Sequence, residues 1–198
     1  PKKFEHKKTT VMPLIRKKYY DTDNYQNEGN FFTITIIGGS QGAKIFDTLI
    51  NELLVKISKI CSLKVVHQTS KKNTDFLENF YRVNKIENKV FTFDENLNIL
   101  LKQSDLCITR AGASSLAELS LLKIPFIAIP LPTSKDNHQY ENAKYYKDKD
   151  CCWVIDQQNF DKQRFEELLI KLSVKKDEYL KKKKNLEKLN YKNSWNNV

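Results

Sequence analysis

The 198-residue chain has few glycines, prolines and cysteines, and it lacks a long hydrophobic run. Five glycines and five prolines are too few for a collagen-like or low-complexity protein. The four cysteines show no CxxC or Cys/His ligand spacing, so they predict no disulfide scaffold or zinc site and suit a reducing cytoplasm. No stretch of 18 apolar residues occurs, and we therefore expect no membrane-spanning helix. Because the chain begins with Pro1 rather than Met, we expect it to be part of a longer protein.

Positive charge is abundant, but it is concentrated at the two ends of the chain. The net charge is +10. Residues 1–18 contain seven Lys or Arg against one Glu, and residues 171–190 contain eight Lys against three acidic residues. A nucleic-acid-binding surface would interleave basic and aromatic side chains, which these ends do not, so we expect no nucleic-acid partner. The basic ends are either solvated helix faces or a surface attracted to an anionic membrane.

Short runs of β-branched and aromatic residues alternate with segments of helical periodicity along the chain. The runs predict strands at residues 31–37, 63–68, 90–93, 105–109, 126–130 and 153–155. The periodic segments predict helices near residues 45–57, 73–83, 96–103, 114–122, 137–147 and 161–190. This alternation is typical of the α/β class, with a Rossmann-like, doubly wound parallel sheet. We expect the folded domain at residues 31–190, between a linker at 1–30 and a tail at 191–198.

A glycine-rich turn at residues 38–43, Gly-Gly-Ser-Gln-Gly-Ala, follows the first predicted strand and precedes a helix. Glycines let the backbone approach a ligand, and the N-terminus of a helix attracts phosphate. The dinucleotide fingerprint G-x-G-x-x-G does not match, because Ser40 and Ala43 stand where its second and third glycines belong. On this motif alone, a phosphate-binding turn and a tight turn without a ligand both remain open.

Two further turns follow the fourth and fifth predicted strands. In the first, residues 109–118, either Ser114 or Ser115 could cap the next helix, and Ser115 with Glu118 fits a capping box. Alternatively, the helix start would bind a diphosphate and the Glu118 carboxylate a ribose diol. The second turn, residues 130–143, leads into a helix rich in hydrogen-bonding groups of the kind that recognise sugars, although His138 alone could equally be a surface histidine.

Together, the three turns resemble the donor-nucleotide half of the family 28 glycosyltransferases, over about residues 10–190. The resemblance implies the C-terminal half of a two-domain GT-B enzyme. Its co-substrate would be UDP-N-acetylglucosamine (UDP-GlcNAc), with no tightly bound cofactor and no metal. The implied reaction is inverting transfer of GlcNAc to the C4 hydroxyl of N-acetylmuramic acid (MurNAc) on lipid I, which yields lipid II for peptidoglycan. The general base would belong to a preceding acceptor domain, so we expect no catalytic residue in this chain and no turnover by it alone.

The same resemblance implies a set of donor-binding residues. It places Gly38, Gly39, Ser40 and Gly42 near the donor phosphates. It places the helix start at Ala113, Ser114 and Ser115 on the pyrophosphate. Glu118 would contact the ribose, and Phe93 with Asp94 would contact the uracil.

Three more positions complete the set. Gln139 matches a glutamine that bonds the GlcNAc hydroxyls, and His138 stands where the family commonly has a second glutamine. Arg16 resembles an arginine near the interdomain linker that approaches the nucleotide.

The resemblance also implies partners and a location. Lipid I would bind through the other domain, and the enzyme would be cytoplasmic and peripheral on the inner face of the bacterial membrane. Two alternatives stay open: another family 28 or GT-B UDP-sugar transferase, such as a glycolipid synthase or a transferase subunit, and a non-catalytic nucleotide-sugar-binding module.

Overall fold

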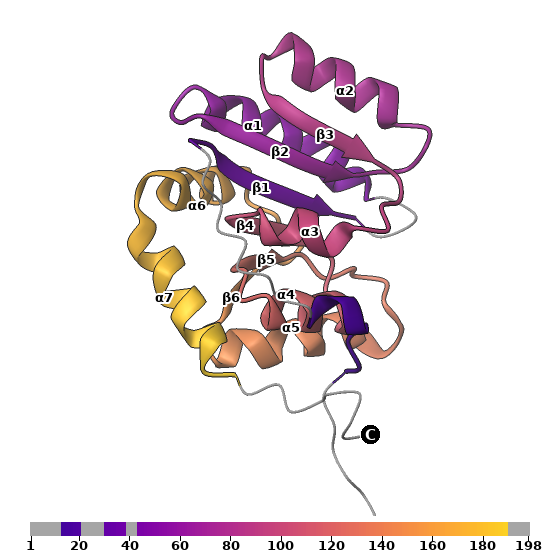
Figure 1. The fold of residues 1–198 in the computed structure, drawn as a ribbon, viewed down its shortest axis with the longest axis vertical. Coiled ribbons are helices and arrows are strands. Elements are labelled where there is room, and N and C mark those ends of the chain that lie inside the picture. The colour runs from indigo at the N-terminus through magenta and orange to yellow at the C-terminus, as the bar shows by residue number, and fades with distance from the viewer. Residues whose placement is uncertain (1–12, 21–29, 39–42, 190–198) are drawn as a thin grey trace, which may run out of the picture.

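The computed structural model describes residues 13–20, 30–38 and 43–189, and within them the chain forms one six-stranded parallel sheet. The strands are β1 (Phe32–Ile37), β2 (Leu63–Gln68), β3 (Glu87–Phe91), β4 (Leu106–Thr109), β5 (Phe126–Ala128) and β6 (Cys152–Val154). Their order across the sheet is β3-β2-β1-β4-β5-β6, and every neighbouring pair is parallel (Figure 1). The predicted doubly wound α/β fold is confirmed.

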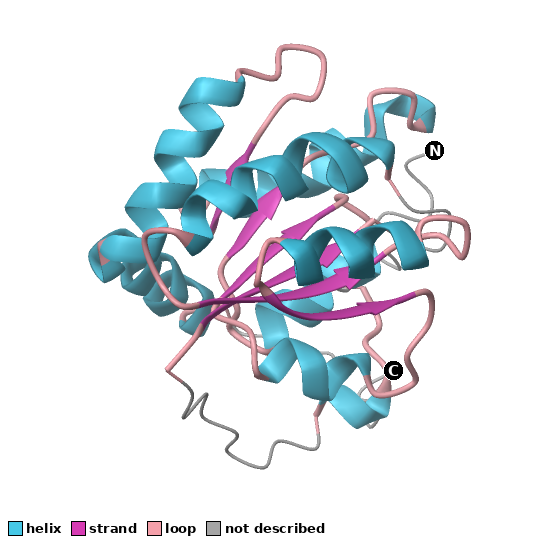
Figure 2. Ribbon diagram, turned by 90° about the horizontal axis from the view of Figure 1, so that it is seen from above, coloured by secondary structure: helices cyan, strands magenta, loops and turns pink. Residues whose placement is uncertain are grey.

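Helices connect successive strands and cover both faces of the sheet (Figure 2). The connecting helices are the π-helical η3 (Phe46–Ile50) that continues into α1 (Asn51–Ser58), α2 (Thr74–Val83), α3 (Leu97–Lys102), α4 (Ala113–Leu121), η4 (Lys135–Asn137) and α5 (His138–Asp148). The helix η2 (Lys17–Tyr19) precedes β1, and α6 (Lys162–Val174) and α7 (Lys176–Glu187) follow β6.

Alternation along the central strands divides the core into two layers. Ile34 and Ile36 of β1 pack with buried side chains of α1, α2 and α6 on one face. Ile37 packs on the other face, with buried side chains of α4, α5 and η2. The N-terminal segment belongs to this second layer, because its Ile15 and Tyr19 are almost completely buried.

Three predicted strands end earlier in the structure than the sequence suggested; the last of them, β6, is displaced by one residue, from 153–155 to 152–154. The edge strand β3 covers residues 87–91 rather than 90–93, because the chain turns at Asp94, whose carboxylate accepts the Asn96 N–H at 2.8 Å. Strand β5 ends at Ala128 rather than at Pro130, since proline has no N–H to continue the ladder. Phe93 therefore lies in a loop and not in a strand.

The strand order reverses between β1 and β4, and this fixes where a ligand would bind. In doubly wound sheets the loops on either side of such a switch point diverge and leave a crevice at the carboxyl ends of the strands. Here Ile37 pairs with Thr109, and the Arg110 N–H donates to the Ile37 carbonyl at 3.3 Å. The buried Gly38, which follows Ile37, thus adjoins the turn that precedes α4. The predicted phosphate residues Gly39, Ser40 and Gly42 lie outside the described residues.

Candidate functional site

The N-terminus of α4 opens at this switch point. Gly112 occupies the N-cap position in an extended conformation, with φ −66° and ψ 135°. Residues 113 and 114 are exposed and Ser115 is half-buried. The Leu116 N–H donates to the Gly112 carbonyl at 3.0 Å, so the N–H groups of residues 113–115 precede the first bond of the helix and have no acceptor within it. Such N–H groups, together with the positive end of the helix dipole, suit an anionic diphosphate.

Of the two alternatives that the sequence left open for this turn, the structure contradicts capping of α4 by Ser114 or Ser115 and the capping box between Ser115 and Glu118. Gly112 takes the cap position, and no side chain caps the helix. Because the helix begins earlier than the serines suggested, both lie inside its first turn. Glu118 lies about one turn further along and makes a different contact.

Glu118 pairs with Arg16, which is 102 positions away in the sequence. The Arg16 Nε and Nη2 atoms donate to the Glu118 Oε1 atom at 3.2 and 3.1 Å. Arg16 Nη2 also donates to the Tyr19 hydroxyl at 2.8 Å. The Arg16 side chain is 53% exposed and that of Glu118 only 9%, so Arg16 covers the carboxylate at the protein surface. Two residues that the sequence predicted for the nucleotide are therefore brought together.

The neighbours of Arg16 favour its protonated form. Partial burial lowers the pKa of the Arg16 guanidinium, but Glu118 and Tyr19 together outweigh this effect and the net pKa is raised. Burial, reinforced by Glu118, raises the pKa of the Tyr19 hydroxyl. Tyr19 therefore stays a neutral acceptor for Arg16 at physiological pH.

The loop that carries Phe93 and Asp94 adjoins the Arg16 segment. Lys18 Nζ donates to the Glu95 carbonyl, and Asn98 Nδ2 donates to the Lys18 carbonyl at 3.1 Å. The Phe93 side chain is 73% exposed, which leaves its ring able to stack on a planar base.

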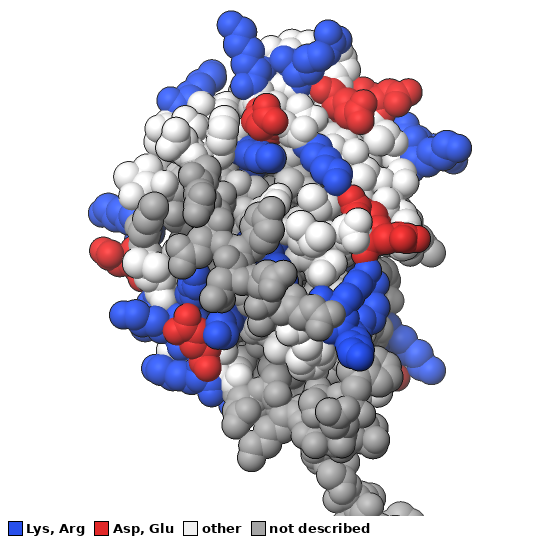
Figure 3. Space-filling model, viewed as in Figure 1, with Lys and Arg blue, Asp and Glu red and all other residues white. Residues whose placement is uncertain are grey.

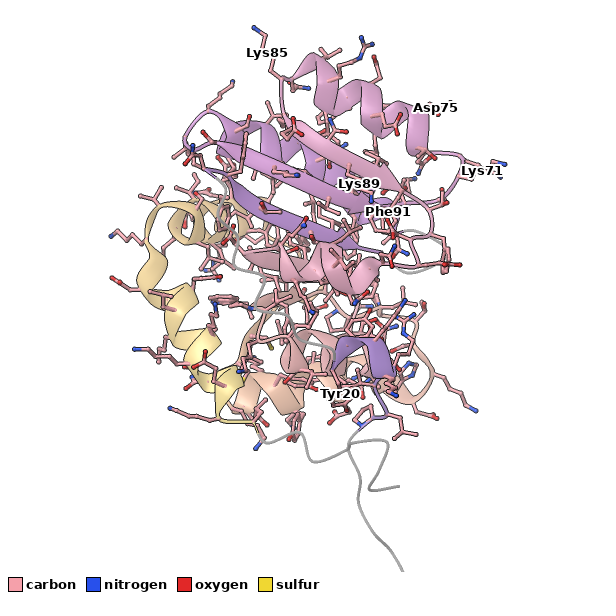
Figure 4. The ribbon with its side chains drawn as sticks, viewed as in Figure 1. Tyr20, Lys71, Asp75, Lys85, Lys89 and Phe91 are labelled. Atoms are coloured by element: carbon pink, nitrogen blue, oxygen red, sulfur yellow. The ribbon has the colours of Figure 1, made fainter. Side chains whose placement is uncertain are left out.

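Asp94 is engaged within the protein. Its Oδ2 atom lies 2.7 Å from Nζ of Lys89, a β3 residue near Phe91 (Figure 4). This contact and the Asn96 N–H lower the pKa of the Asp94 carboxyl. The polar part of Asp94 thus stabilises the loop.

Gln139, in the first turn of α5, connects two loops of the site. Its Oε1 atom accepts the Ala111 N–H at 3.2 Å and the Leu131 N–H at 2.9 Å. The side-chain oxygen is thus committed to the backbone, and the amide nitrogen is the part of Gln139 that suits a sugar hydroxyl. His138 is exposed, and its Nδ1 atom lies 2.7 Å from the Lys135 carbonyl.

A cavity of about 300 Å³ opens beside the start of α5. The chain turns there through two consecutive left-handed residues, Asp136 and Asn137, with φ of 51° and 53°. The lining combines ring and amide groups with one carboxylate, from Pro130, Leu131, Pro132, Asn137, Tyr140, Asp156 and Gln158. Its size lies at the lower end of the range for small-molecule sites.

Sequence reasoning missed two residues that shape this site, Arg110 and Asn142. Arg110 bonds the loops after β5 and β6, and Asn142 Nδ2 donates to the Ala111 carbonyl at 3.0 Å. One signal was available for Arg110: a charged residue directly after the fully buried strand β4. Asn142 lies in the predicted turn and helix at residues 130–143, but the sequence assigned it no role.

A buried polar network joins η3, the helix that follows the glycine-rich turn, to β2 and to α2. Asp47 Oδ2 accepts from Thr69 Oγ1 at 2.9 Å and from Asn73 Nδ2 at 2.6 Å. Asp47 Oδ1 lies 3.3 Å from His67 Nε2, and His67 Nδ1 lies 2.7 Å from the Tyr81 hydroxyl. A neutral His67 with its proton on Nε2 directs that proton toward the Asp47 carboxylate, while Nδ1 accepts from the Tyr81 hydroxyl.

Asp47 and His67 have lowered pKa values, whereas burial raises the pKa of the Tyr81 hydroxyl. Burial lowers the pKa of the His67 imidazole and outweighs the opposing effect of Asp47. Burial raises the pKa of the Asp47 carboxyl, but hydrogen bonds from His67, Asn73 and Thr69 outweigh it and the net pKa is lowered. The folded chain therefore favours neutral His67 beside ionised Asp47.

These shifts predict that acid destabilises the fold. With both pKa values lower in the folded chain, the unfolded chain binds more protons, so the free energy of unfolding falls as the pH drops. The loss should begin near the ordinary histidine pKa of 6.5 and grow again near the ordinary aspartate pKa of 3.8. Melting temperatures recorded from pH 8 to about pH 3 measure it.

His67→Gln supplies the critical comparison, because glutamine keeps hydrogen-bonding groups but cannot titrate. Its melting temperature should change less between pH 7.5 and pH 5 than that of the wild type. His138→Gln, at an exposed histidine, should keep the wild-type slope. Equal slopes in all three proteins would contradict the role assigned to His67.

Among residues 13–20, 30–38 and 43–189, no group of three or more His, Cys, Asp or Glu side chains could hold a metal ion. No helix in these ranges is both long and apolar enough to cross a membrane.

Comparison with known proteins relates the chain to glycosyltransferases. A protein of Pelagibacter ubique (strain HTCC1062), named UDP-N-acetylglucosamine--N-acetylmuramyl-(pentapeptide) pyrophosphoryl-undecaprenol N-acetylglucosamine transferase, is 41% identical over 100% of this chain and 56% of its own length. A protein of the same name from Rickettsia prowazekii (strain Madrid E) is 34% identical over 82% of this chain and 42% of its own. The chain thus spans about half the length of the curated relatives it matches.

Solved structures show the same fold. Acinetobacter baumannii MurG superposes with a TM-score of 0.68 at 23% identity, covering 87% of this chain and 49% of MurG. WaaG, a glycosyltransferase involved in lipopolysaccharide biosynthesis, superposes with a TM-score of 0.64 at 14% identity, covering 91% of this chain and 52% of WaaG. The model of the glycosyltransferase family 28 C-terminal domain matches residues 33–196. The chain therefore belongs to the glycosyltransferase family 28 C-terminal domain family.

Proposed function

We propose that this chain binds the donor UDP-GlcNAc in an inverting transferase that adds GlcNAc to the C4 hydroxyl of MurNAc on lipid I. The names of the relatives support the substrates, since the 41% identity extends over the whole chain. The observation that carries the proposal is the start of α4 at the switch point, with the Arg16–Glu118 pair one turn behind it. A second domain would supply the acceptor site and the general base.

Each part of the nucleotide has a counterpart in this arrangement. The diphosphate would lie on the N–H groups of residues 113–115, where the helix dipole stabilises negative charge. The Glu118 carboxylate would accept from the ribose hydroxyls while Arg16 holds its Oε1 atom. The exposed ring of Phe93 would stack on the uracil.

The sugar would extend toward α5, where the Gln139 amide nitrogen and the cavity beside Tyr140 and Asn137 offer polar and ring contacts. When the acceptor hydroxyl attacks C1 of GlcNAc, the C1–oxygen bond breaks and UDP leaves with the bonding electrons. Fixed N–H dipoles at the start of α4 would stabilise the charge that develops on UDP.

A ranking of ligands by calorimetric titration tests this proposal. UDP and UDP-GlcNAc should bind the chain more tightly than NADH, ATP or duplex DNA at moderate salt. If NADH binds with an affinity equal to that of UDP, the site is a dinucleotide site instead. If duplex DNA binds most tightly, the basic ends serve nucleic acid.

We also propose that the parent enzyme is cytoplasmic and lies on the anionic inner face of the membrane. On the face shown in Figure 3, Lys and Arg side chains are interspersed with Asp and Glu. The helix α7 carries the exposed Lys181, which pairs with Asp150 at 2.9 Å, and adds exposed lysines at positions 183 and 184. Near an anionic bilayer each such lysine contributes roughly 1 kcal/mol of attraction.

The chain should therefore sediment with phosphatidylglycerol vesicles at low salt and dissociate as ionic strength rises, because salt screens these charges. Phosphatidylcholine vesicles are the neutral control. Equal binding to both vesicle types, or to neither, would contradict an electrostatic attachment through this half of the enzyme.

A further inference from the structure

Arg110 occupies the centre of the proposed donor site without belonging to the predicted ligand set. Its Nη1 atom lies 3.0 Å from the Ile129 carbonyl oxygen and 2.6 Å from Oε1 of Gln157. The Pro130 carbonyl oxygen is also within reach, at 3.4 Å. On another side, the guanidinium carbon lies 5.1 Å from the ring centroid of the fully buried Phe46.

These contacts join four parts of the fold at one side chain. Phe46 belongs to the helix after β1, and Ile129 and Pro130 belong to the loop after β5. Gln157 follows β6, and Arg110 itself follows β4. All four lie at the carboxyl edge of the sheet, where the donor would bind.

The backbone next to Arg110 is held equally firmly. The Ala111 N–H donates to Gln139 Oε1, and the Ala111 carbonyl accepts from Asn142 Nδ2. The next residue, Gly112, begins α4. The direction of the N–H groups at residues 113–115 therefore depends on how residues 110 and 111 are fixed.

We propose that Arg110 is a positioning residue for the diphosphate, which it serves by fixing the start of α4 against the loops after β5 and β6. This inference rests on the proposed function. Lysine cannot replace the arrangement, because a planar guanidinium bonds several carbonyls while its face packs on a ring. Burial lowers the pKa of Arg110, because removal from water disfavours the charged form of the guanidinium.

The experiment compares UDP and uridine binding to the 198-residue chain by NMR titration, for the wild type, Arg110→Lys, Gln157→Ala and the double variant. Arg110→Lys should lower the affinity for UDP by about 10-fold, an effect of the size common for residues that orient a binding group. Uridine should bind as before, because it has no diphosphate. Gln157→Ala should lower the affinity for UDP by a smaller factor. The double variant should bind UDP as tightly as Arg110→Lys does, since Gln157 acts through Arg110.

Gln163→Ala is the matched control: this glutamine is exposed on α6, its Nε2 atom donates to Glu167 Oε1 at 3.1 Å, and it does not line the cavity beside α5. It should bind UDP as the wild type does. If Arg110→Lys does not fold, Gln157→Ala and its control carry the test.

Three results would overturn the inference. Normal UDP binding by Gln157→Ala and Arg110→Lys removes the positioning role. Weak UDP binding by Arg110→Lys with normal binding by Gln157→Ala indicates that Arg110 touches the diphosphate itself. Equal losses of UDP and uridine indicate a merely structural residue. A wild-type chain that binds no UDP contradicts the proposed function instead, so the two failures are distinguishable.

Discussion

Ser114→Asp is expected to abolish UDP binding and to leave the fold intact. The side chain is exposed in the first turn of α4, where the diphosphate is proposed to lie. A carboxylate at a helix N-terminus interacts favourably with the dipole, by about 0.3–1 kcal/mol, so the melting temperature should hold or rise. Juxtaposed like charges cost several kcal/mol, which corresponds to a loss of UDP affinity of about 100-fold or more.

Ser114→Asn separates charge from size, because asparagine has the shape of aspartate without its charge. It should retain most of the UDP affinity. Uridine should bind both variants as it binds the wild type. If Ser114→Asp binds UDP normally, the diphosphate does not lie at the start of α4.

Glu118→Gln should have the second largest effect, again on affinity more than on stability. Glutamine keeps the shape and an oxygen for Arg16, but it loses the charge-assisted hydrogen bonds to the ribose hydroxyls. Such bonds are worth roughly 1.5–3 kcal/mol, so UDP affinity should fall on the order of 10- to 100-fold. Ion pairs with an exposed partner contribute about 0–1 kcal/mol, and Arg16 is half exposed, so the stability loss should be small.

Glu166→Gln is the matched control, because Glu166 pairs with Lys56 at 2.7 Å on the face covered by α1 and α6. It should alter the melting temperature about as much as Glu118→Gln and leave UDP affinity unchanged. Early melting of Glu118→Gln with normal UDP binding would mean that Glu118 serves only the contact with Arg16.

The fold was predictable because its central strands carry a strong local signal. Residues 63–68 centre on the β-branched pair Val65 and Val66, and β2 has those bounds in the structure. The edge strand β3 was placed too far along the chain, because it pairs on one side only and three of its five residues are polar or charged. An apolar run identifies a strand that is buried on both faces, whereas an edge strand lacks that constraint.

The site was predictable only in outline. The sequence predicted that a helix starts after β4, but it did not predict that Gly112 rather than a serine occupies the N-cap position. It also could not pair Arg16 with Glu118 or direct the Gln139 oxygen to two backbone N–H groups, since these contacts join segments far apart in the chain. Residue types predicted the ligand chemistry, while the partners of those residues depend on tertiary packing.

The central claim is that a donor diphosphate lies on the N–H groups at the start of α4. Amide resonances of residues 113–115, followed by ¹H–¹⁵N NMR during titration with UDP, test it most directly. Hydrogen bonds to phosphate oxygens should shift these amide protons downfield with UDP, and uridine should leave them unchanged. If UDP saturates the chain while these three resonances stay in place and others move, the diphosphate binds elsewhere and the account is wrong.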